Sequence, residues 1–114
     1  KGEKLRFYVL LLPNELKPFL EYQKKVIERE FPYSLEKAGC EIERLTIGEK
    51  YMELVFLIPV RADIKQALDK VINECNQYGN FLSQVFTITN VKELSAEEVE
   101  EIIKKNGGNS QASH

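Results

Sequence analysis

The most informative stretch of the chain is CEIERLTIGEKYMELVFLIP, residues 40–59. From Glu41 to Ile47 the side chains alternate with a period of two, which is typical of a β-strand. The turn formers Gly48-Glu49-Lys50 follow, and Tyr51 to Ile58 is then almost continuously apolar. The stretch therefore predicts a hairpin whose second strand lies in the interior of a sheet and ends at Pro59.

The segment before this hairpin predicts one strand and a helical region. Leu5 to Leu12 (LRFYVLLL) is apolar and closes at Pro13-Asn14, as a buried strand does. Asn14 is expected to cap the helix that follows, and Pro32 should kink or stop that helix. Gly39 suits a left-handed residue at its end, so the region is expected to hold a kinked helix or two short ones.

The segment after the hairpin predicts a second helix and a last strand. Asp63 and Gln66 form a capping pair, and one apolar face then runs from Ile64 to Cys75. Residues Phe81 to Val91 alternate and are rich in β-formers, so they are expected to form a strand.

A third helix is expected near the end of the chain. Ser95 and Glu98 have the spacing of a capping box, and Leu94 and Val99 can form the hydrophobic staple around it. Gly107-Gly108 should end this helix at about residue 105.

The element order β-α-β-β-α-β-α predicts an α+β fold of the ferredoxin-like type, a split β-α-β arrangement with helices on one face of an antiparallel sheet. Residues 1–106 are expected to form this single domain, and residues 107–114 a disordered polar tail. Since this fold serves many functions, the function has to be inferred from a site.

Composition narrows the range of partners. Sixteen Lys and Arg against 18 Asp and Glu give a formal charge of -2, so the chain as a whole attracts neither nucleic acid nor anionic lipid. No apolar run approaches the roughly 20 residues of a membrane-spanning helix. Cys40 and Cys75 have no companions for a zinc site or a disulfide framework, which favours free thiols in a reducing, cytoplasmic setting.

Few residues suggest catalysis. The one histidine is His114, and the phosphate-binding and nucleophile-elbow motifs are missing from the sequence. Tyr51 and Glu53 are two apart on a strand and share a face, where a carboxylate could bind a cation or act as a base. A structural role is the commoner one for such a carboxylate. No metal or cofactor is expected.

Two groups of residues could contact nucleic acid. Strand aromatics can stack on bases, although in most proteins they belong to the core; here they are Phe7, Tyr8, Phe56 and Phe86. Basic side chains can contact phosphates, and the candidates are Lys24, Lys25, Arg44 and Arg61. The lysines are interleaved with glutamates, as on an ordinary solvated helix.

Residues 40–59 resemble the small single-tyrosine HUH transposases of insertion sequences and their repeat-associated domesticated relatives. In that family a strand and hairpin precede Asp-His-hydrophobic-His, which runs into an apolar strand ending in proline; the similar strand here is Lys50 to Pro59. The likeness continues through Ile64 to Tyr78 and Val85 to Asn90. Leu94 to Asn106 follows the spacing of the family's Val-Ser-x-Glu-x-Val-x-x-Tyr-Ile-x-x-Gln pattern.

The resemblance implies a scaffold that has lost its catalytic residues. Tyr51 and Glu53 stand where the family has its two metal-binding histidines, Ile102 replaces the nucleophilic tyrosine, and Asn106 replaces a glutamine ligand. Isoleucine has no nucleophilic atom, so a covalent DNA intermediate cannot form at that position. The chain is therefore expected not to be an enzyme.

The leading hypothesis is a degenerate, non-catalytic relative of these transposases that forms a homodimer and binds DNA as single strands or hairpins. The dimer follows from the resemblance, and pairing of sheet edges is also a general protection against aggregation. The alternative is a protein-interaction or regulatory domain of the same fold without a nucleic-acid role, favoured by the acidic last helix and a pI near 5.5. A third, less favoured hypothesis is a metal-dependent enzyme that uses Tyr51 and Glu53.

Overall fold

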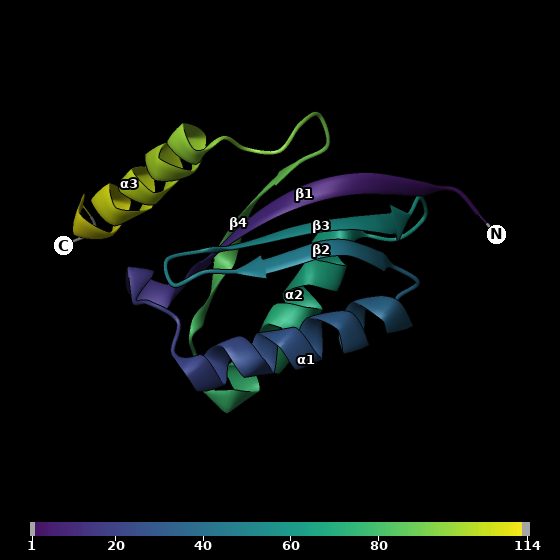
Figure 1. Ribbon diagram of the computed structural model, residues 1–114, viewed down its shortest axis with the longest axis horizontal. Coiled ribbons are helices and arrows are strands. Elements are labelled where there is room, and N and C mark those ends of the chain that lie inside the picture. Colours follow the sequence, from purple (N-terminus) through teal and green to yellow (C-terminus); the bar gives the residue numbers. More distant parts are fainter. Residues whose placement is uncertain (1, 113–114) are drawn as a thin grey trace.

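The sheet has four strands and is flanked by three helices (Figure 1) in a computed structural model that describes residues 2–112. The strands are β1 (Lys4–Pro13), β2 (Glu41–Ile47), β3 (Met52–Pro59) and β4 (Leu82–Thr89). The helices are α1 (Glu21–Lys37), α2 (Ile64–Cys75) and α3 (Ala96–Ala112). Two short 3₁₀ turns, η1 (Asn14–Leu16) and η2 (Asn76–Tyr78), follow β1 and α2.

The strand order is β2-β3-β1-β4, and every pair of neighbours is antiparallel. The connection through α1 passes over β3, and the connection through α2 passes over β1. This interleaving confirms the ferredoxin-like α+β fold. The hairpin of β2 and β3 and the interior position of β3 are also as the sequence predicts.

The two faces of the sheet carry different layers. α1 and α2 lie together on one face, whereas α3 lies on the other (Figure 1). The main core lies under α1 and α2, because alternate strand residues such as Val9, Leu11 and Leu54 point there and are fully buried. The expectation that helices occupy one face thus holds for α1 and α2, and α3 adds a second layer.

The start of α1 differs from the sequence-based expectation. Asn14 does not cap this helix: α1 begins at Glu21, and the N–H of Leu20 donates to Gln23 Oε1 at 2.8 Å. Pro18 explains the delay, since the residue before a proline favours extended backbone and Lys17 has φ -78° and ψ 131°.

The expected interruption at Pro32 is not found, because α1 runs unbroken to Lys37. A proline inside a helix costs about 3 kcal/mol. Phe31 and Leu35 are fully buried beside it, and burying each side chain contributes about 1.5–3 kcal/mol, which offsets that cost. Gly39 has φ 86° after the helix, so the predicted left-handed residue is confirmed.

α3 begins as the sequence predicts and ends later. Glu98 N donates to Ser95 Oγ at 3.1 Å and Ser95 N donates to Glu98 Oε1 at 2.7 Å, which confirms the capping box. The predicted end at Gly107-Gly108 is wrong, because α3 continues to Ala112. Gly107 lies close to Leu16 of η1, because an added Cβ would come within 3.3 Å of Leu16 Cδ1, so the helix has a tertiary neighbour at the point where local preference would end it.

The helix therefore includes residues 107–112 of the expected polar tail, and residues 113–114 lie outside the described part of the chain. Within residues 2–112, none of the helices combines the length and the apolarity that crossing a bilayer requires.

Candidate functional site

The face of the sheet under α3 holds a small apolar cluster, which we call the α3-face cluster. Its buried members are Tyr8, Leu10 and Leu12 of β1, Val55 of β3 and Val99 of α3. Partly buried side chains pack around them: Leu16, Tyr51, Leu94, Ile102 and Ile103. Leu94 and Val99 are both members, as the predicted staple requires.

The α3-face cluster brings together two positions that the sequence singled out. Tyr51, directly before β3, and Ile102 on α3 are 51 positions apart in the chain, yet both pack against this one cluster. The contact is apolar: Ile102 has only carbon atoms in its side chain. The arrangement fixes α3 on the sheet and provides no nucleophile at residue 102.

Glu53 lies beside the cluster and is bound by a residue that sequence reasoning did not assign to the site. Tyr8 Oη donates a hydrogen bond of 2.6 Å to Glu53 Oε2. Burial and then this hydrogen bond raise the pKa of the Tyr8 phenol above its ordinary value. Glu53 therefore has a structural partner. This contact could not be predicted from nearby residues in the sequence, because Tyr8 and Glu53 lie on two different strands.

Asn106 uses its side-chain amide within its own helix. Its Nδ2 donates to the Ile102 carbonyl at 2.8 Å, and the residue borders a shallow pocket of about 270 Å³ between η1 and β4. Among the described residues, no three His, Cys, Asp or Glu side chains are grouped closely enough to hold a metal ion. The metal-dependent enzyme of the third hypothesis therefore gains no support from such a group and stays a prediction.

The aromatic side chains proposed for base stacking are not available for it. Phe56 is fully buried and Tyr8 is nearly so, while Phe7 and Phe86 pack against the main core under α1 and α2. Their place in or against the core is the commoner one for strand aromatics, as expected from the sequence.

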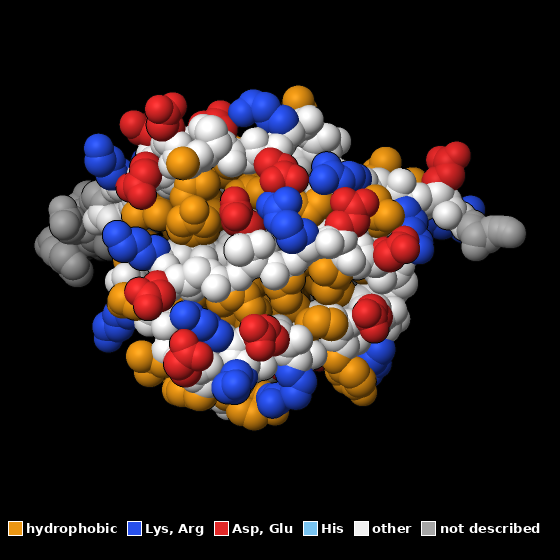
Figure 2. Space-filling view, viewed as in Figure 1, with side chains coloured by type: hydrophobic (Ala, Val, Ile, Leu, Met, Phe, Trp, Pro, Cys, Tyr) orange, Lys and Arg blue, Asp and Glu red, His pale blue; other side chains and the backbone are white. Residues whose placement is uncertain are grey.

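The four basic candidates do not form one surface. Lys24 and Lys25 are on α1, whereas Arg44 pairs in register with Val55 and therefore lies on the α3 face of the sheet. Arg61 is exposed in the turn between β3 and α2. Lys24 also has an acidic neighbour, with its Nζ 3.5 Å from Glu21 Oε2. In Figure 2, basic and acidic side chains are interspersed over the visible face without a large basic patch.

Arg44 belongs to a network of charged side chains, the arginine cluster, which consists of Arg6, Glu43, Arg44 and Glu93. Arg44 Nη2 and Nη1 donate to the two carboxylate oxygens of Glu93 at 2.9 and 3.2 Å. Arg6 Nη2 approaches Glu93 Oε2 at 3.5 Å, and Arg6 Nε donates to Glu43 Oε1 at 2.8 Å. The hydrogen bonds from Arg44, with its positive charge, lower the pKa of the Glu93 carboxyl.

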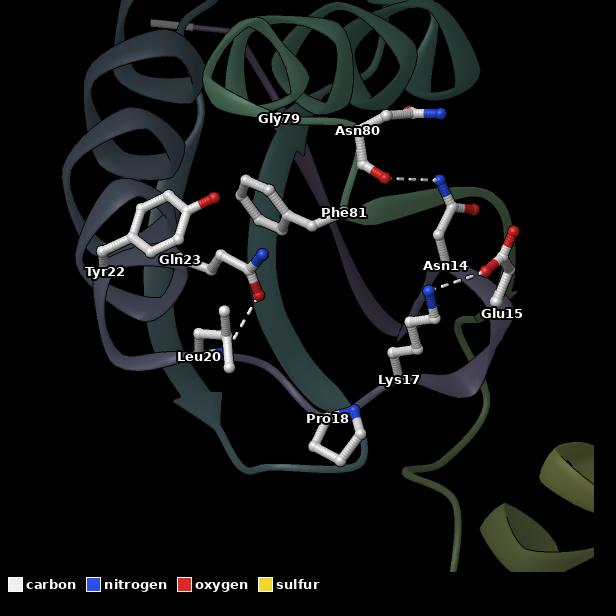
Figure 3. Close-up of a pocket in the computed structure, with 10 residues that line it drawn as sticks. All are labelled: Asn14, Glu15, Lys17, Pro18, Leu20, Tyr22, Gln23, Gly79, Asn80 and Phe81. Carbon is white, nitrogen blue, oxygen red and sulfur yellow. Dashed lines mark hydrogen bonds and ion pairs between the residues drawn. The ribbon is translucent and has the colours of Figure 1, made fainter.

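A larger pocket lies elsewhere, at the start of α1 (Figure 3). It has a volume of about 680 Å³ and is bordered by Tyr22 and Phe81 together with polar side chains such as Gln23. At the edge of the pocket, Asn14 Nδ2 donates a hydrogen bond of 3.0 Å to the Asn80 carbonyl and so links two of its segments. None of the sequence-predicted site residues lines this pocket. It is formed by the segment before α1, the first turn of α1 and the residues before β4, which meet only in the folded chain, so no local signal marks it.

Comparison with known proteins gives structural likeness alone. No protein-family model matches the chain, and no curated protein matches it by sequence. Among solved structures, the chain is similar to a candidate transposase from Deinococcus radiodurans R1, with a TM-score of 0.73, 12% identity and coverage of 92% of each chain. It is also similar to a REP-associated tyrosine transposase bound to a REP hairpin, with a TM-score of 0.65 and 10% identity. That match covers 89% of this chain and 64% of the other. The chain therefore has a transposase-like fold.

Proposed function

We propose that this chain is a non-catalytic domain of transposase-like fold that binds DNA as hairpins or single strands. The observation that carries the proposal is the packing of Ile102 and Tyr51 into the α3-face cluster. In the single-tyrosine transposases that the sequence resembles, these two positions hold the nucleophile and a metal ligand. The helix and strand are still brought together here, while the residues at their contact are suited to packing.

The DNA-binding part of the proposal draws on one structural neighbour and on one surface. The REP-associated tyrosine transposase of similar fold is bound to a hairpin. In this chain the α3 face presents Arg6 and Arg44, whose planar guanidinium groups suit phosphate oxygens. The near-neutral charge of the chain means that any such binding has to be local.

The experiment measures binding and cleavage with the same oligonucleotide. We expect a fluorescently labelled DNA hairpin with a single-stranded extension to bind, and its affinity to fall as salt rises from about 50 to about 200 mM. With Mg²⁺ or Mn²⁺ added, denaturing gels should show neither a nick nor a covalent adduct. A nick or an adduct would show that the domain is catalytic.

The competing function is a protein-interaction or regulatory domain. It is favoured by the exposed glutamates of α3, Glu97, Glu100 and Glu101. Absence of any anisotropy change with hairpin or single-stranded DNA at low salt would support this function and reject DNA binding. Light scattering after gel filtration tests the proposed homodimer, which predicts twice the mass of one chain. A reducing, cytoplasmic setting stays a prediction that agrees with the two free, buried thiols.

A further inference from the structure

The two arginines of the arginine cluster converge from strands on either side of β3. Arg6 of β1 pairs in register with Leu57, and Arg44 of β2 pairs with Val55, so both lie on the α3 face and reach across β3. Both side chains are about half exposed. Because strands of one sheet hold them, their spacing does not depend on a mobile loop.

The carboxylate of Glu93 lies between these two arginines and comes from a loop, whereas the arginines come from strands. Glu93 lies in the connection from β4 to α3, which passes over the sheet on the side away from α1 and α2 (Figure 1). Within the described residues, the stretch 91–94 makes no backbone-to-backbone hydrogen bond outside the helices and strands. Its contacts include Val91 N to Thr89 Oγ1 at 3.2 Å and the pairing of Lys92 with Glu98 at 2.9 Å.

The geometry at Glu93 is that of an anion held by two guanidinium groups. Arg44 contacts both carboxylate oxygens and Arg6 approaches one of them. A phosphate offers the same kind of oxygen acceptors as a carboxylate to such a fork. Without Glu93, the hydrogen-bonded acidic partner left to the two arginines would be Glu43 on Arg6, with the Glu53 carboxylate acting on Arg44 without a hydrogen bond. The four residues of the cluster would then change from net neutral to net positive.

We propose that Arg6 and Arg44 form a phosphate-binding site, and that the Glu93 carboxylate occupies it until a phosphate of a DNA strand displaces it. The proposal rests on the proposed DNA-binding function and names the two residues that would contact a phosphate of the DNA. Displacement needs only movement of the connection before α3, since the arginines are already placed by the sheet. Exposed ion pairs of this kind contribute little stability, so the exchange is energetically accessible.

The test compares Glu93→Gln with Glu100→Gln, which removes the same charge from an exposed position on α3. Binding of the labelled DNA hairpin with its single-stranded extension is followed by fluorescence anisotropy at several salt concentrations.

E93Q should bind about three- to tenfold more tightly than the unchanged chain. Its salt dependence should steepen by about 0.7 in the logarithmic slope for each added phosphate contact. E100Q should change the affinity less than about twofold. The gain should vanish in E93Q/R44A.

A second measurement probes the site without DNA. Inorganic phosphate is titrated into isotope-labelled E93Q, and the side-chain Nε–H signals of Arg6 and Arg44 are followed by NMR. These two signals should shift in E93Q and remain nearly fixed in the unchanged chain. The thermal midpoint of E93Q should stay within a few degrees of the original, because only exposed ion pairs are lost.

The outcomes separate the two proposals. If the unchanged chain binds DNA and E93Q binds it equally, the phosphate site is wrong and the proposed function stands. If no variant binds DNA and phosphate still shifts the arginine signals of E93Q, the site stands and the proposed function fails. Absence of both responses overturns both.

Discussion

The two faces of this sheet are built from the same strands and differ in what covers them. Under α1 and α2 most residues of the central strands are fully buried in one large apolar core, and partly buried strand side chains such as Ile42 and Ile88 pack at its edge. Under α3 a small apolar cluster adjoins polar groups, namely the Tyr8–Glu53 pair and the arginine cluster. α1 and α2 are inserted between strands, whereas α3 follows the last strand and is linked to it by a loosely held connection. The comparison indicates that one face provides stability and the other is free to carry a binding site.

Leu10 and Leu11 test this difference most directly, since they are neighbours on β1, point to opposite faces and are equally buried. We expect Leu11→Ala to cost about 3–5 kcal/mol of unfolding free energy and Leu10→Ala about 2–3 kcal/mol. The cost at residue 10 is smaller because α3 can move toward the space that the substitution leaves. Urea denaturation measures both values. Equal costs would show that the α3 face is as tightly packed as the main core.

The Tyr8–Glu53 hydrogen bond is the next largest expected effect. Tyr8→Phe should lower stability at neutral pH by about 2 kcal/mol, the range for a hydrogen bond to a charged acceptor. Tyr33→Phe is the control, because Tyr33 is 63% exposed. Denaturation curves of both variants measure the difference, and similar small losses would show that the bond is not stabilising.

The same pair predicts a dependence on alkaline pH. The folded state raises the pKa of Tyr8 above its ordinary value of 10.0, so the folded chain holds this proton more tightly than the unfolded chain. Its contribution is complete below about pH 10 and is lost as pH rises further, toward the folded pKa. Stability of the unchanged chain should therefore fall more steeply above pH 10 than that of Tyr8→Phe. Parallel pH profiles would contradict the assignment.

Substitutions at the helix caps are expected to give the smallest losses of stability. They also test whether α2 and α3 unfold with the same part of the domain. Asp63 accepts a hydrogen bond from Gln66 N at 3.1 Å, and Ser95 accepts one from Glu98 N at 3.1 Å. Asp63→Ala and Ser95→Ala should each cost about 1 kcal/mol. In amide hydrogen exchange, Asp63→Ala should accelerate the slowest amides of the whole domain, whereas Ser95→Ala should accelerate mainly those of α3. Global acceleration by both would mean that α3 unfolds together with the core.

Much of the fold could be predicted from the sequence, and the errors have physical causes. The caps at Asp63 and Ser95 and the turn at Gly39 were predictable because their hydrogen bonds and dihedral angles depend on residues a few positions apart. The rules for Pro32 and for Gly107-Gly108 gave wrong ends. Burial of Phe31 and Leu35 offsets the cost of Pro32, and Gly107 lies close to Leu16 of η1, a neighbour that local rules do not include.

The candidate site was less accessible from the sequence. That Tyr51 and Glu53 share a face follows from strand periodicity alone. The hydrogen bond from Tyr8 to Glu53 spans 45 positions, and the fork from Arg44 to Glu93 spans 49. Both depend on how the strands pair and on where the connection to α3 crosses the sheet.

The amino-acid sequence by itself determined the type and order of the elements, most of their starts and the absence of a nucleophile at Ile102. The tertiary structure alone decided that α3 covers the second face, that Tyr8 binds Glu53 and that Glu93 lies between Arg6 and Arg44. The reason is range: secondary structure is set by interactions within a turn or two of the chain, while a site is set by contacts between residues that the fold brings together.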